Sequence, residues 1–446
     1  MGSRAVNSPI VLASRVRNQK PNVWVEINKA VSKYRPLNLG QGFPDTPPKA
    51  HVLESLGALT GPDVNPLFHQ YTRSMGHPRL VTILGKIYTP FFRCDPKMYE
   101  TIKELADESF APTRSLDPLN EIIVSVGAYG GLYAAISSLI DPGDEVIVMD
   151  PSFDCYIPMI ETAGGVPVFV PLRPTKSLSD DGITSDDWRL DFKELESKIT
   201  PETKMLILNT PHNPLGKVFD RDELEKIADI CIRHNLVCLA DEVYEWLVFP
   251  PKSHIKIASL PGMWNRTLTV GSAGKTFSMT GWKLGWTVGP ARLIEGMQLH
   301  QQNTVYTCPT PIQEALARSL EIELPLMSTP KSYFQEVREF IEPRGREMVK
   351  QLNAVGMRAV RPTGGYFLFA DVSKMRVPAN EIDDDPKVAY DIRFNNWMME
   401  KKGIAAIPVS VFYSQENRYL GSNYLRFCFF KTKETLDKFY NALGKW

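Results

Sequence analysis

Short apolar runs alternate with amphipathic stretches through the middle of the chain. The runs lie at residues 122–126, 146–149, 205–208, 237–240 and 267–270, and most are bounded by Gly, Pro, Asp or Asn. Buried strands of a parallel sheet have this length and these boundaries. Between two of the runs, Asp220 and Glu223 have the spacing of a capping box and predict the start of a helix. This alternation predicts an α/β domain with a mostly parallel sheet over residues 71–325.

The end of the chain has a different pattern. Residues 332–352 have helical periodicity, but we expect Pro343 and Gly345 to interrupt it. Strands are expected at residues 366–370 and 424–430, followed by a closing helix at residues 434–443. This pattern predicts a smaller α+β domain over residues 326–446. We expect residues 24–70 to pack with this domain and residues 1–23 to form a flexible N-terminal lead-in.

Composition argues against several classes of partner. The chain has 446 residues, enough for two domains, and its 51 basic residues balance 51 acidic ones. A net charge of zero does not favour nucleic acid or an acidic membrane. No apolar run approaches the ~20 residues that a membrane span needs, and the cysteines form no close pair of the metal-binding kind. We therefore predict no metal, no nucleic acid and no membrane.

The N-terminal residues carry a weak targeting signal. Arg4, Arg15, Arg17 and Lys20 precede the first acidic residue, Glu26, and serines lie between them. This composition is typical of a mitochondrial transit peptide, and it is equally compatible with a solvated lead-in. The predicted compartment is therefore the cytoplasm or the mitochondrion.

The strongest chemical motif is residues 271–285, GSAGKTFSMTGWKLG, which begin as a buried strand ends. A single lysine is most often an exposed loop cation. Lys275, however, is crowded by glycine and serine, which let another molecule approach the backbone closely. Ser272 and Lys283 could both reach one phosphate. A desolvated lysine near other cations has a lowered pKa and can become a Schiff-base nucleophile.

Asp241 and Tyr244 follow the apolar run 237–240 directly. In open α/β sheets, ligands bind beyond the carboxyl ends of the strands. A carboxylate buried there can pair with a pyridine nitrogen and keep it protonated, as an electron-sink cofactor requires. Tyr244, about one turn later, could reach the oxygen of the same ring. The alternative is a helix N-cap aspartate with a surface tyrosine.

Two turns carry weaker signals. Residues 209–216, NTPHNPLG, follow another strand, and their X-Pro steps could turn the Asn213 amide toward the cleft. An ordinary β-turn is the alternative. Residues 127–131, GAYGG, join a strand to a helix whose first N–H groups could bind a phosphate. Their spacing is not that of G-x-G-x-x-G, which argues against a nucleotide-dependent oxidoreductase.

Arg426 lies in an apolar strand, between Leu425 and Phe427. A buried guanidinium needs an anionic partner. That partner is either an internal carboxylate or the α-carboxylate of a substrate, held by two parallel hydrogen bonds.

Together these motifs resemble the class I/II aminotransferases of the fold-type I pyridoxal-phosphate superfamily. Residues 38–45 (NLGQGFPD), 209–218, 241–246 and 271–285 resemble more closely the kynurenine aminotransferases, also known as glutamine transaminase K or cysteine-S-conjugate β-lyase. The resemblance runs in one order from about Trp24 to Trp446. It implies a large domain with a mostly parallel seven-stranded sheet, a smaller α+β domain, pyridoxal 5′-phosphate as cofactor, and a homodimer.

The resemblance also implies a role for each matching residue. Lys275 would bind the cofactor covalently and then carry protons during catalysis. The cofactor would be bound by Ala128, Tyr129, Ser272 and Lys283 at its phosphate, Phe153 on its ring face, Asp241 at its ring nitrogen, and Asn213 and Tyr244 at its ring oxygen, with Tyr71 crossing to the phosphate of the other subunit. The substrate would be bound by Trp24, Gly42, Asn213, Tyr306 and Arg426.

Two positions depart from part of the family. Tyr306 and Thr307 precede Cys308, where one branch has Phe-His, so the amino-acid preference should differ from that of the histidine-bearing branch. Lys283 stands where many aminotransferases have arginine, which keeps the charge but loses the planar fork.

The expected reaction is a ping-pong transamination. An amino group would move from a large neutral or aromatic amino acid, such as kynurenine, glutamine or a phenylalanine-like compound, to a 2-oxo acid. One alternative uses the same site for β-elimination from cysteine conjugates. Another is a non-catalytic sensor on the same fold, against which the intact Lys275, Asp241 and Arg426 argue.

Overall fold

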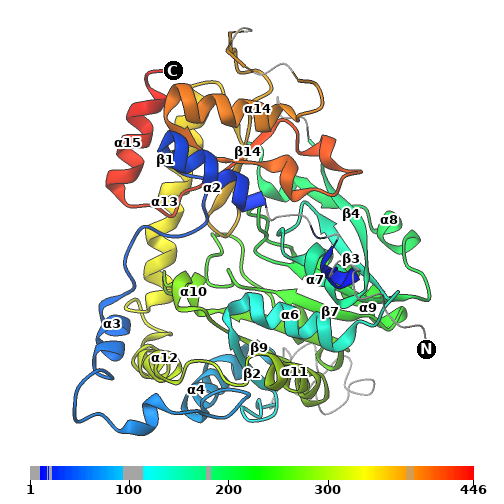
Figure 1. The fold of residues 1–446 in the computed structure, drawn as a ribbon, viewed down its shortest axis with the longest axis vertical. Coiled ribbons are helices and arrows are strands. Elements are labelled where there is room, and N and C mark those ends of the chain that lie inside the picture. The colour runs from blue at the N-terminus through cyan, green and yellow to red at the C-terminus, as the bar shows by residue number, and fades with distance from the viewer. Residues whose placement is uncertain are drawn as a thin grey trace.

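An eight-stranded sheet forms the centre of the larger part of the molecule (Figure 1). The computed structural model describes residues 11–17, 19, 23–93, 114–176, 182–378, 381–382 and 385–446. The strand order is β2-β9-β8-β7-β6-β3-β4-β5. The strands are β2 (Ile122–Val126), β3 (Glu145–Asp150), β4 (Val166–Pro174), β5 (Trp188–Leu190), β6 (Thr203–Asn209), β7 (Val237–Asp241), β8 (Thr267–Ser272) and β9 (Leu284–Val288).

The five apolar runs that predicted strands all lie in this sheet, as β2, β3, β6, β7 and β8. The neighbours from β4 through β3, β6 and β7 to β8 are parallel. Strand β9 is antiparallel to both β2 and β8, and β5 is antiparallel to β4. The expected number of seven strands is therefore corrected to eight. The short edge strand β5 is only three residues long and leaves no recognisable apolar run.

Nine described helices belong to this larger part of the molecule, and several of them pack on the sheet. They are α3 (Ala50–Gly57), α4 (Pro78–Tyr88), α6 (Gly127–Leu139), α7 (Tyr156–Ala163), α8 (Phe192–Ser197), α9 (Arg221–Arg233), α10 (Ala273–Thr276), α11 (Ala291–Thr304) and α12 (Thr310–Glu323). Helix α9 begins with the predicted capping box: Asp220 accepts a hydrogen bond from the Glu223 backbone, and the Glu223 side chain accepts one from the Asp220 backbone. Helix α6 begins at Gly127, directly after β2. No helix in the described part of the chain has the length and apolarity to cross a bilayer.

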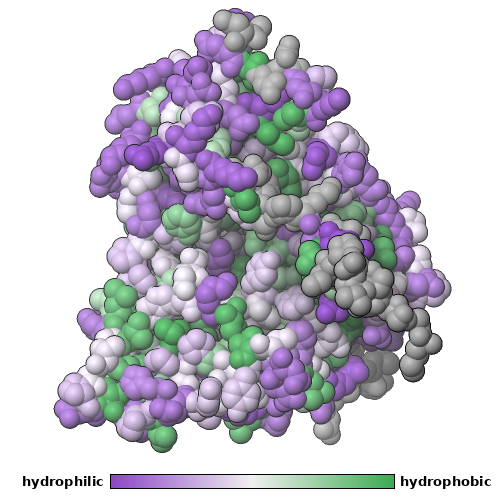
Figure 2. Space-filling view, viewed as in Figure 1, coloured by the Kyte–Doolittle hydropathy of each residue, from purple (hydrophilic) through white to green (hydrophobic). Residues whose placement is uncertain are grey.

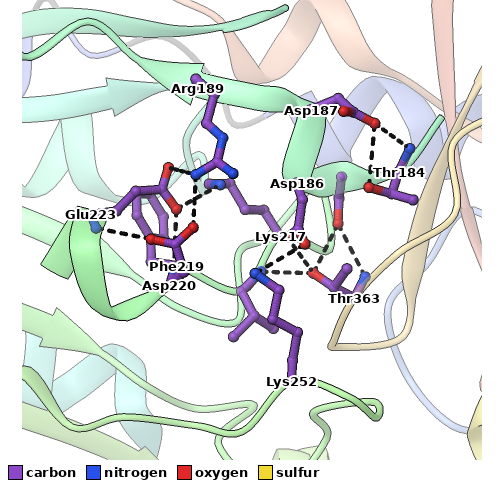
Figure 3. A network of polar contacts seen from close by, with 12 residues as sticks. Thr184, Asp186, Asp187, Arg189, Lys217, Phe219, Asp220, Glu223, Lys252 and Thr363 are labelled. Atoms are coloured by element: carbon purple, nitrogen blue, oxygen red, sulfur yellow. Dashed lines mark hydrogen bonds and ion pairs between the residues drawn. The ribbon is translucent and has the colours of Figure 1, made fainter. Parts of the chain in front are cut away.

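A network of polar side chains, partly buried, connects the start of α9 with the C-terminal part of the chain (Figure 3). The Lys217 ammonium has no solvent exposure and lies 3.0 Å from the Glu223 carboxylate. Arg189, in β5, contacts Asp220 at 2.8 Å and Glu223 at 3.1 Å. The backbone N–H of residue 218 donates to the hydroxyl of Thr363, which lies in the loop before β11 (Phe367–Asp371), at 3.0 Å. The network thus holds β5, α9 and the C-terminal part together.

The C-terminal part contains a four-stranded antiparallel sheet in the order β10-β11-β14-β13. Its elements, with the separate strand β12, are α13 (Tyr333–Ala354), β10 (Arg358–Ala359), β11 (Phe367–Asp371), α14 (Tyr390–Trp397), β12 (Ile404–Ala405), β13 (Ile407–Pro408), β14 (Tyr424–Cys428) and α15 (Lys433–Leu443). The two strands and the closing helix expected here are β11, β14 and α15.

The expected interruption of the helix around Pro343 is wrong, because α13 is continuous over its 22 residues. Its apolar face, with Ile341, Met348 and Leu352, is fully buried. Gly345 lets the Phe429 ring lie against the helix, since an added Cβ would come within 3.1 Å of that ring. Tertiary packing therefore outweighs the loss of one backbone hydrogen bond at the proline.

The N-terminal segment contacts both parts of the molecule. Helix α2 (Val23–Tyr34) and strand β1 (Leu37–Asn38) lie on the C-terminal part, where β1 pairs in parallel with β12. Helix α3 and the 3-10 helix Pro66–His69 instead contact α12. Of the expected lead-in, residues 1–10, 18 and 20–22 lie outside the described residues, and α1 (Ser14–Arg17) lies beside α7. The domain boundaries remain a prediction.

Candidate active site

The carboxyl ends of β6, β7 and β8 meet at a cavity of about 160 Å³. Asn209 and Asp241 end β6 and β7, and Ser272 ends β8. The cavity is lined by Gly127, Ala128, Tyr129, Leu132, Phe153, Asn209, Asn213, Asp241, Val243, Tyr244, Ser272, Gly274, Lys275, Thr280, Lys283 and Leu284. This is the edge of an α/β sheet at which ligands bind. Every residue predicted to bind a cofactor lines it, except Tyr71.

Asp241 provides a buried carboxyl group in the cavity wall. Its Oδ2 accepts a hydrogen bond from the Tyr156 hydroxyl at 2.5 Å, and its Oδ1 accepts a long one from the Val243 backbone at 3.4 Å. Burial raises the pKa of Asp241 to about 6, and the hydrogen bond from Tyr156 opposes this rise. Its backbone carbonyl accepts from the Asn209 side chain at 2.8 Å, which ties the ends of β6 and β7 together.

Lys275 lies in the short helix α10, which follows β8. The Ser272 hydroxyl accepts from the Lys275 backbone N–H at 3.3 Å and so caps this helix. The Lys275 ammonium donates to the Gly42 carbonyl at 3.3 Å. Burial lowers the pKa of Lys275 to about 8, and the nearby Arg426 charge adds to the effect. Its amine is therefore partly neutral near neutral pH, which a Schiff-base nucleophile requires.

The other end of the cavity is built for an anion. Helix α6 begins there, and its first N–H groups have no partner within the helix. Gly285 allows β9 to approach this turn, since an added Cβ would lie 2.5 Å from the Ala128 nitrogen. Lys283 is in the left-handed region (φ 54°), and its amine lies next to Gly127 and over the Tyr129 ring at 5.8 Å. This end of the cavity is therefore lined by the Lys283 amine, the N-terminus of α6 and the Ser272 hydroxyl.

The donor set fits pyridoxal 5′-phosphate. One cavity brings together the Lys275 amine, whose pKa is lowered, the buried carboxyl group of Asp241, and an end that can bind a phosphate. Phe153 lines the same cavity and offers a ring face, and the buried Tyr244 offers a phenol whose pKa is raised by burial. The residues that would hold the cofactor are thus present with the chemistry that each part of it needs.

Arg426 is buried in β14, with 1% of its surface exposed. It donates to the Asn213 side-chain oxygen and to the Gly40 carbonyl, both at 2.8 Å. Its guanidinium carbon lies 4.0 Å from the centre of the Phe367 ring. In the described chain it forms no ion pair with Asp or Glu, and its Nε has no partner. The charge of Asp154 acts on the guanidinium from a distance, but no ion pair with a described residue uses its donors, so it keeps donor capacity for an anion.

The N-terminal segment contacts the site through Gly42 and Trp24. The Gly42 carbonyl accepts from both Lys275 and the Tyr366 hydroxyl, at 3.3 and 2.9 Å. Only glycine fits at this position, because an added Cβ would lie 2.4 Å from the Phe367 ring. Trp24 donates its indole N–H to Asp154 at 3.0 Å, and the Arg426 guanidinium lies 5.7 Å from its ring.

Comparison with known proteins agrees with this arrangement. The family model of aminotransferase class I and II matches residues 38–443. The chain belongs to this aminotransferase family. It is 47% identical to kynurenine–oxoglutarate transaminase 3 of Mus musculus, covering 97% of this chain and 90% of that protein. It is 43% identical to kynurenine–oxoglutarate transaminase 1 of Homo sapiens, covering 95% and 96% of the two chains.

A solved structure shares the whole fold. Bna3p of Saccharomyces cerevisiae aligns with a TM-score of 0.86 and 33% identity, covering 98% of both chains. The aminotransferase fold therefore extends through both parts of this chain.

Two predicted residues of this aminotransferase lie apart from the cavity. Tyr71 is 80% exposed and Tyr306 is 55% exposed, and their rings meet edge to face with centroids 5.3 Å apart. Tyr71 lines a separate recess with residues 69–70 and 307–311. Within one chain, the structure does not bring Tyr71 to the phosphate end of the cavity. Trp24, Gly42 and Arg426 do not line the cavity themselves, but each lies near it through the contacts described above.

Sequence reasoning missed two tyrosines of the site. Tyr156 contacts Asp241 from the first turn of α7, and Tyr366 contacts the Gly42 carbonyl from the residue before β11. A signal for Tyr156 was present, because it lies three residues after Phe153, in reach of the same wall. The aromatic strand around Tyr366 gave no indication of which ring faces the site.

A second polar cluster lies next to the site. Glu242, Glu245 and His254 have ligand atoms close enough for a metal ion. The Lys256 ammonium lies between the two carboxylates, at 2.8 and 2.6 Å, and the Tyr88 hydroxyl donates to Glu245 at 2.5 Å. A lysine thus already supplies the positive charge that these carboxylates need.

Proposed function

We propose that this chain is a pyridoxal-5′-phosphate-dependent aminotransferase that moves an amino group from a large neutral or aromatic amino acid to a 2-oxo acid. The observation that carries the proposal is the placement of Lys275, whose amine of lowered pKa shares one cavity with the buried Asp241. The relatives named for kynurenine–oxoglutarate transamination support kynurenine as the donor and 2-oxoglutarate as the acceptor.

Bound pyridoxal phosphate supplies an electron sink for the charge that develops at the substrate's α-carbon. Lys275 holds the cofactor and then takes and returns the α-proton at its Nζ. Asp241 keeps a negative charge beside the ring nitrogen, so that the nitrogen stays protonated. Ser272, Lys283 and the start of α6 hold the phosphate.

Arg426 and the Asn213 amide orient the substrate. The guanidinium keeps donors for the α-carboxylate, and its contacts with Asn213 and Gly40 fix its plane. The pocket beside it is aromatic, with Trp24 and Phe367 next to the guanidinium. An aromatic pocket beside a cavity whose described lining includes no arginine suits large neutral side chains better than a dicarboxylate.

We propose that the active form is a homodimer. Hydrophobic surface gathers over α3 and α12 in Figure 2. Leu53, in α3, and Leu67, in the 3-10 helix that contacts α12, are exposed. Tyr71, in the same part of the chain, is exposed to a degree that is unusual for a large ring. A second copy would cover this surface and carry Tyr71 to the other subunit's phosphate end. Light scattering of the purified protein should give twice the mass of one chain, and a monomer that is fully active would contradict this proposal.

The proposed activity is tested with purified protein, added cofactor, and a panel of amino acids and 2-oxo acids. We expect a visible cofactor band, and 2-oxo acid production from kynurenine, glutamine and phenylalanine. Lys275→Ala should keep the fold but abolish turnover. A protein that binds no cofactor, or a Lys275→Ala variant with near-wild-type turnover, would refute the proposal. A cysteine conjugate in the same panel measures β-elimination separately, as pyruvate release.

A further inference from the structure

One hydrogen bond connects Asp241, in the wall of the cavity, to Tyr156, which lies behind it. The Tyr156 hydroxyl lies 2.5 Å from Asp241 Oδ2, and both side chains are buried. This length is typical of a hydroxyl that donates to an ionised oxygen. Burial raises the pKa of Tyr156 well above its ordinary value, and the Asp241 charge raises it further. The phenol therefore keeps its proton and acts as the donor.

The two oxygens of Asp241 thus have different surroundings. Oδ2 is held by the short bond from Tyr156, while Oδ1 has, in the described part of the chain, just the long contact of 3.4 Å with the Val243 backbone. One oxygen is fixed from behind, and the other keeps acceptor capacity at the edge of the cavity.

We propose that Tyr156 is a positioning residue for transamination, which holds the Asp241 carboxylate in one orientation and in its ionised form beside the cofactor's ring nitrogen. This inference rests on the proposed function. A donor to a carboxylate stabilises its charged form. Without that donor, the carboxyl group would take up a proton more readily and could no longer act as the anionic partner of the ring.

The remaining charges around Asp241 do not replace this donor. The groups that face the carboxyl group besides Tyr156 are Lys275, Glu242, Tyr244 and Cys155. Lys275 favours ionisation of Asp241, but it becomes part of the reacting centre. Glu242 opposes ionisation, although its own charge is paired with Lys256 and His254. Of the described side chains, Tyr156 is the one that donates a hydrogen bond to this carboxylate.

The test compares Tyr156→Phe with Tyr88→Phe. Phenylalanine keeps the ring of Tyr156 and its edge-to-face contact with Phe153, at 5.9 Å between centroids. Tyr88 is a matched control, because its hydroxyl also lies 2.5 Å from a buried carboxylate, that of Glu245, but does not contact Asp241. Both variants lose one phenol-to-carboxylate hydrogen bond of the same length.

We expect Tyr156→Phe to bind the cofactor but to lose roughly tenfold or more in single-turnover rate near neutral pH, with little change in KM. The acid limb of its rate and of the bound-cofactor spectrum should move upward by about one pH unit. The direction follows because Asp241, with a pKa of about 6, would lose an effect that lowers its pKa. Tyr88→Phe should leave both profiles unchanged. Tyr156→His, which keeps an N–H donor, should recover most of the rate.

Three outcomes separate the inference from the function on which it rests. A wild-type protein without a cofactor band or transamination refutes the proposed function itself. An active wild type whose Tyr156→Phe variant matches Tyr88→Phe in spectrum and pH profile overturns the role of Tyr156. A Tyr156→His variant with the same displaced acid limb as Tyr156→Phe also overturns it, because donation would then not be the cause.

Discussion

Replacing Arg426 with alanine should separate carboxylate binding from every other function of the site. The guanidinium is 1% exposed and lies between apolar neighbours in β14, so water cannot readily take its place. Burial lowers its pKa to about 10, which still leaves it charged at neutral pH. The charge is therefore kept in an apolar strand with no ion pair to a described Asp or Glu, and a bound α-carboxylate would supply one.

The size of the effect follows from that burial. Removing one partner of a buried, hydrogen-bonded charge pair costs about 2–5 kcal/mol, which corresponds to a fall in kcat/KM of roughly thirty-fold to several thousand-fold. Part of the packing is lost as well, because the guanidinium lies 4.0 Å from the Phe367 ring and 4.8 Å from the Phe412 ring. Arg426→Lys should recover only part of the activity, since it keeps the charge but not the planar fork.

The assay compares phenylalanine with 2-phenylethylamine, which lacks the carboxylate. We expect Arg426→Ala to lose kcat/KM on the amino acid and far less on the amine, while the cofactor spectrum stays that of wild type. Thermal melts of both proteins show how much of the loss comes from packing. Equal losses on the two substrates, or no loss on the amino acid, would make Arg426 a structural residue and place the carboxylate elsewhere.

Three further changes test the rest of the site and the fold. Asp241→Asn should retain the cofactor, through its phosphate contacts, but should slow the single-turnover rate; an unchanged rate would contradict the role of Asp241 at the ring nitrogen. Because the pKa of Lys275 is lowered from 10.5 to about 8, cofactor-free protein should react with added pyridoxal phosphate at a rate that rises with pH and levels off above about 8. A rate that rises steadily toward pH 10.5 would show an ordinary lysine. Glu223→Gln leaves the buried Lys217 ammonium without its main anion, so the melting temperature should fall by several degrees, for a cost of about 3–5 kcal/mol. Glu225→Gln removes an exposed ion pair within the helix and should change the melting temperature little. Equal melting temperatures of the Glu223→Gln and Glu225→Gln variants would refute the argument.

The central strands could be predicted because each is buried and bounded by polar or turn residues. Strands β7 and β8, for example, are almost entirely buried, so their apolar runs are continuous. Strand β5 could not be found in this way, since its three residues carry no pattern. The continuity of α13 was also missed, because the packing of Phe429 against Gly345 comes from a strand far along the chain.

The candidate site could likewise be predicted only in part from the sequence. Asp241 ends β7 and Lys275 lies three residues after β8, so their position at one sheet edge could be predicted from the local sequence. The contacts that complete the site join distant segments: Lys275 to Gly42 across 233 positions, and Arg426 to Asn213 across 213. No local pattern specifies such a contact, and the shared carbonyl of Gly42 became visible only in the structure.

The pairing of β1 with β12 determines the order in which this chain can acquire its structure during synthesis. Leu37 pairs with Ile404, so β1 leaves the ribosome long before its partner exists. At about 5–20 residues per second, that wait is roughly 20 to 70 s. By then every strand of the eight-stranded sheet, which ends at Val288, has been made. The segment carrying Gly42 is therefore translated long before the strands it docks against, and the nascent enzyme cannot close its own active site until those C-terminal strands emerge.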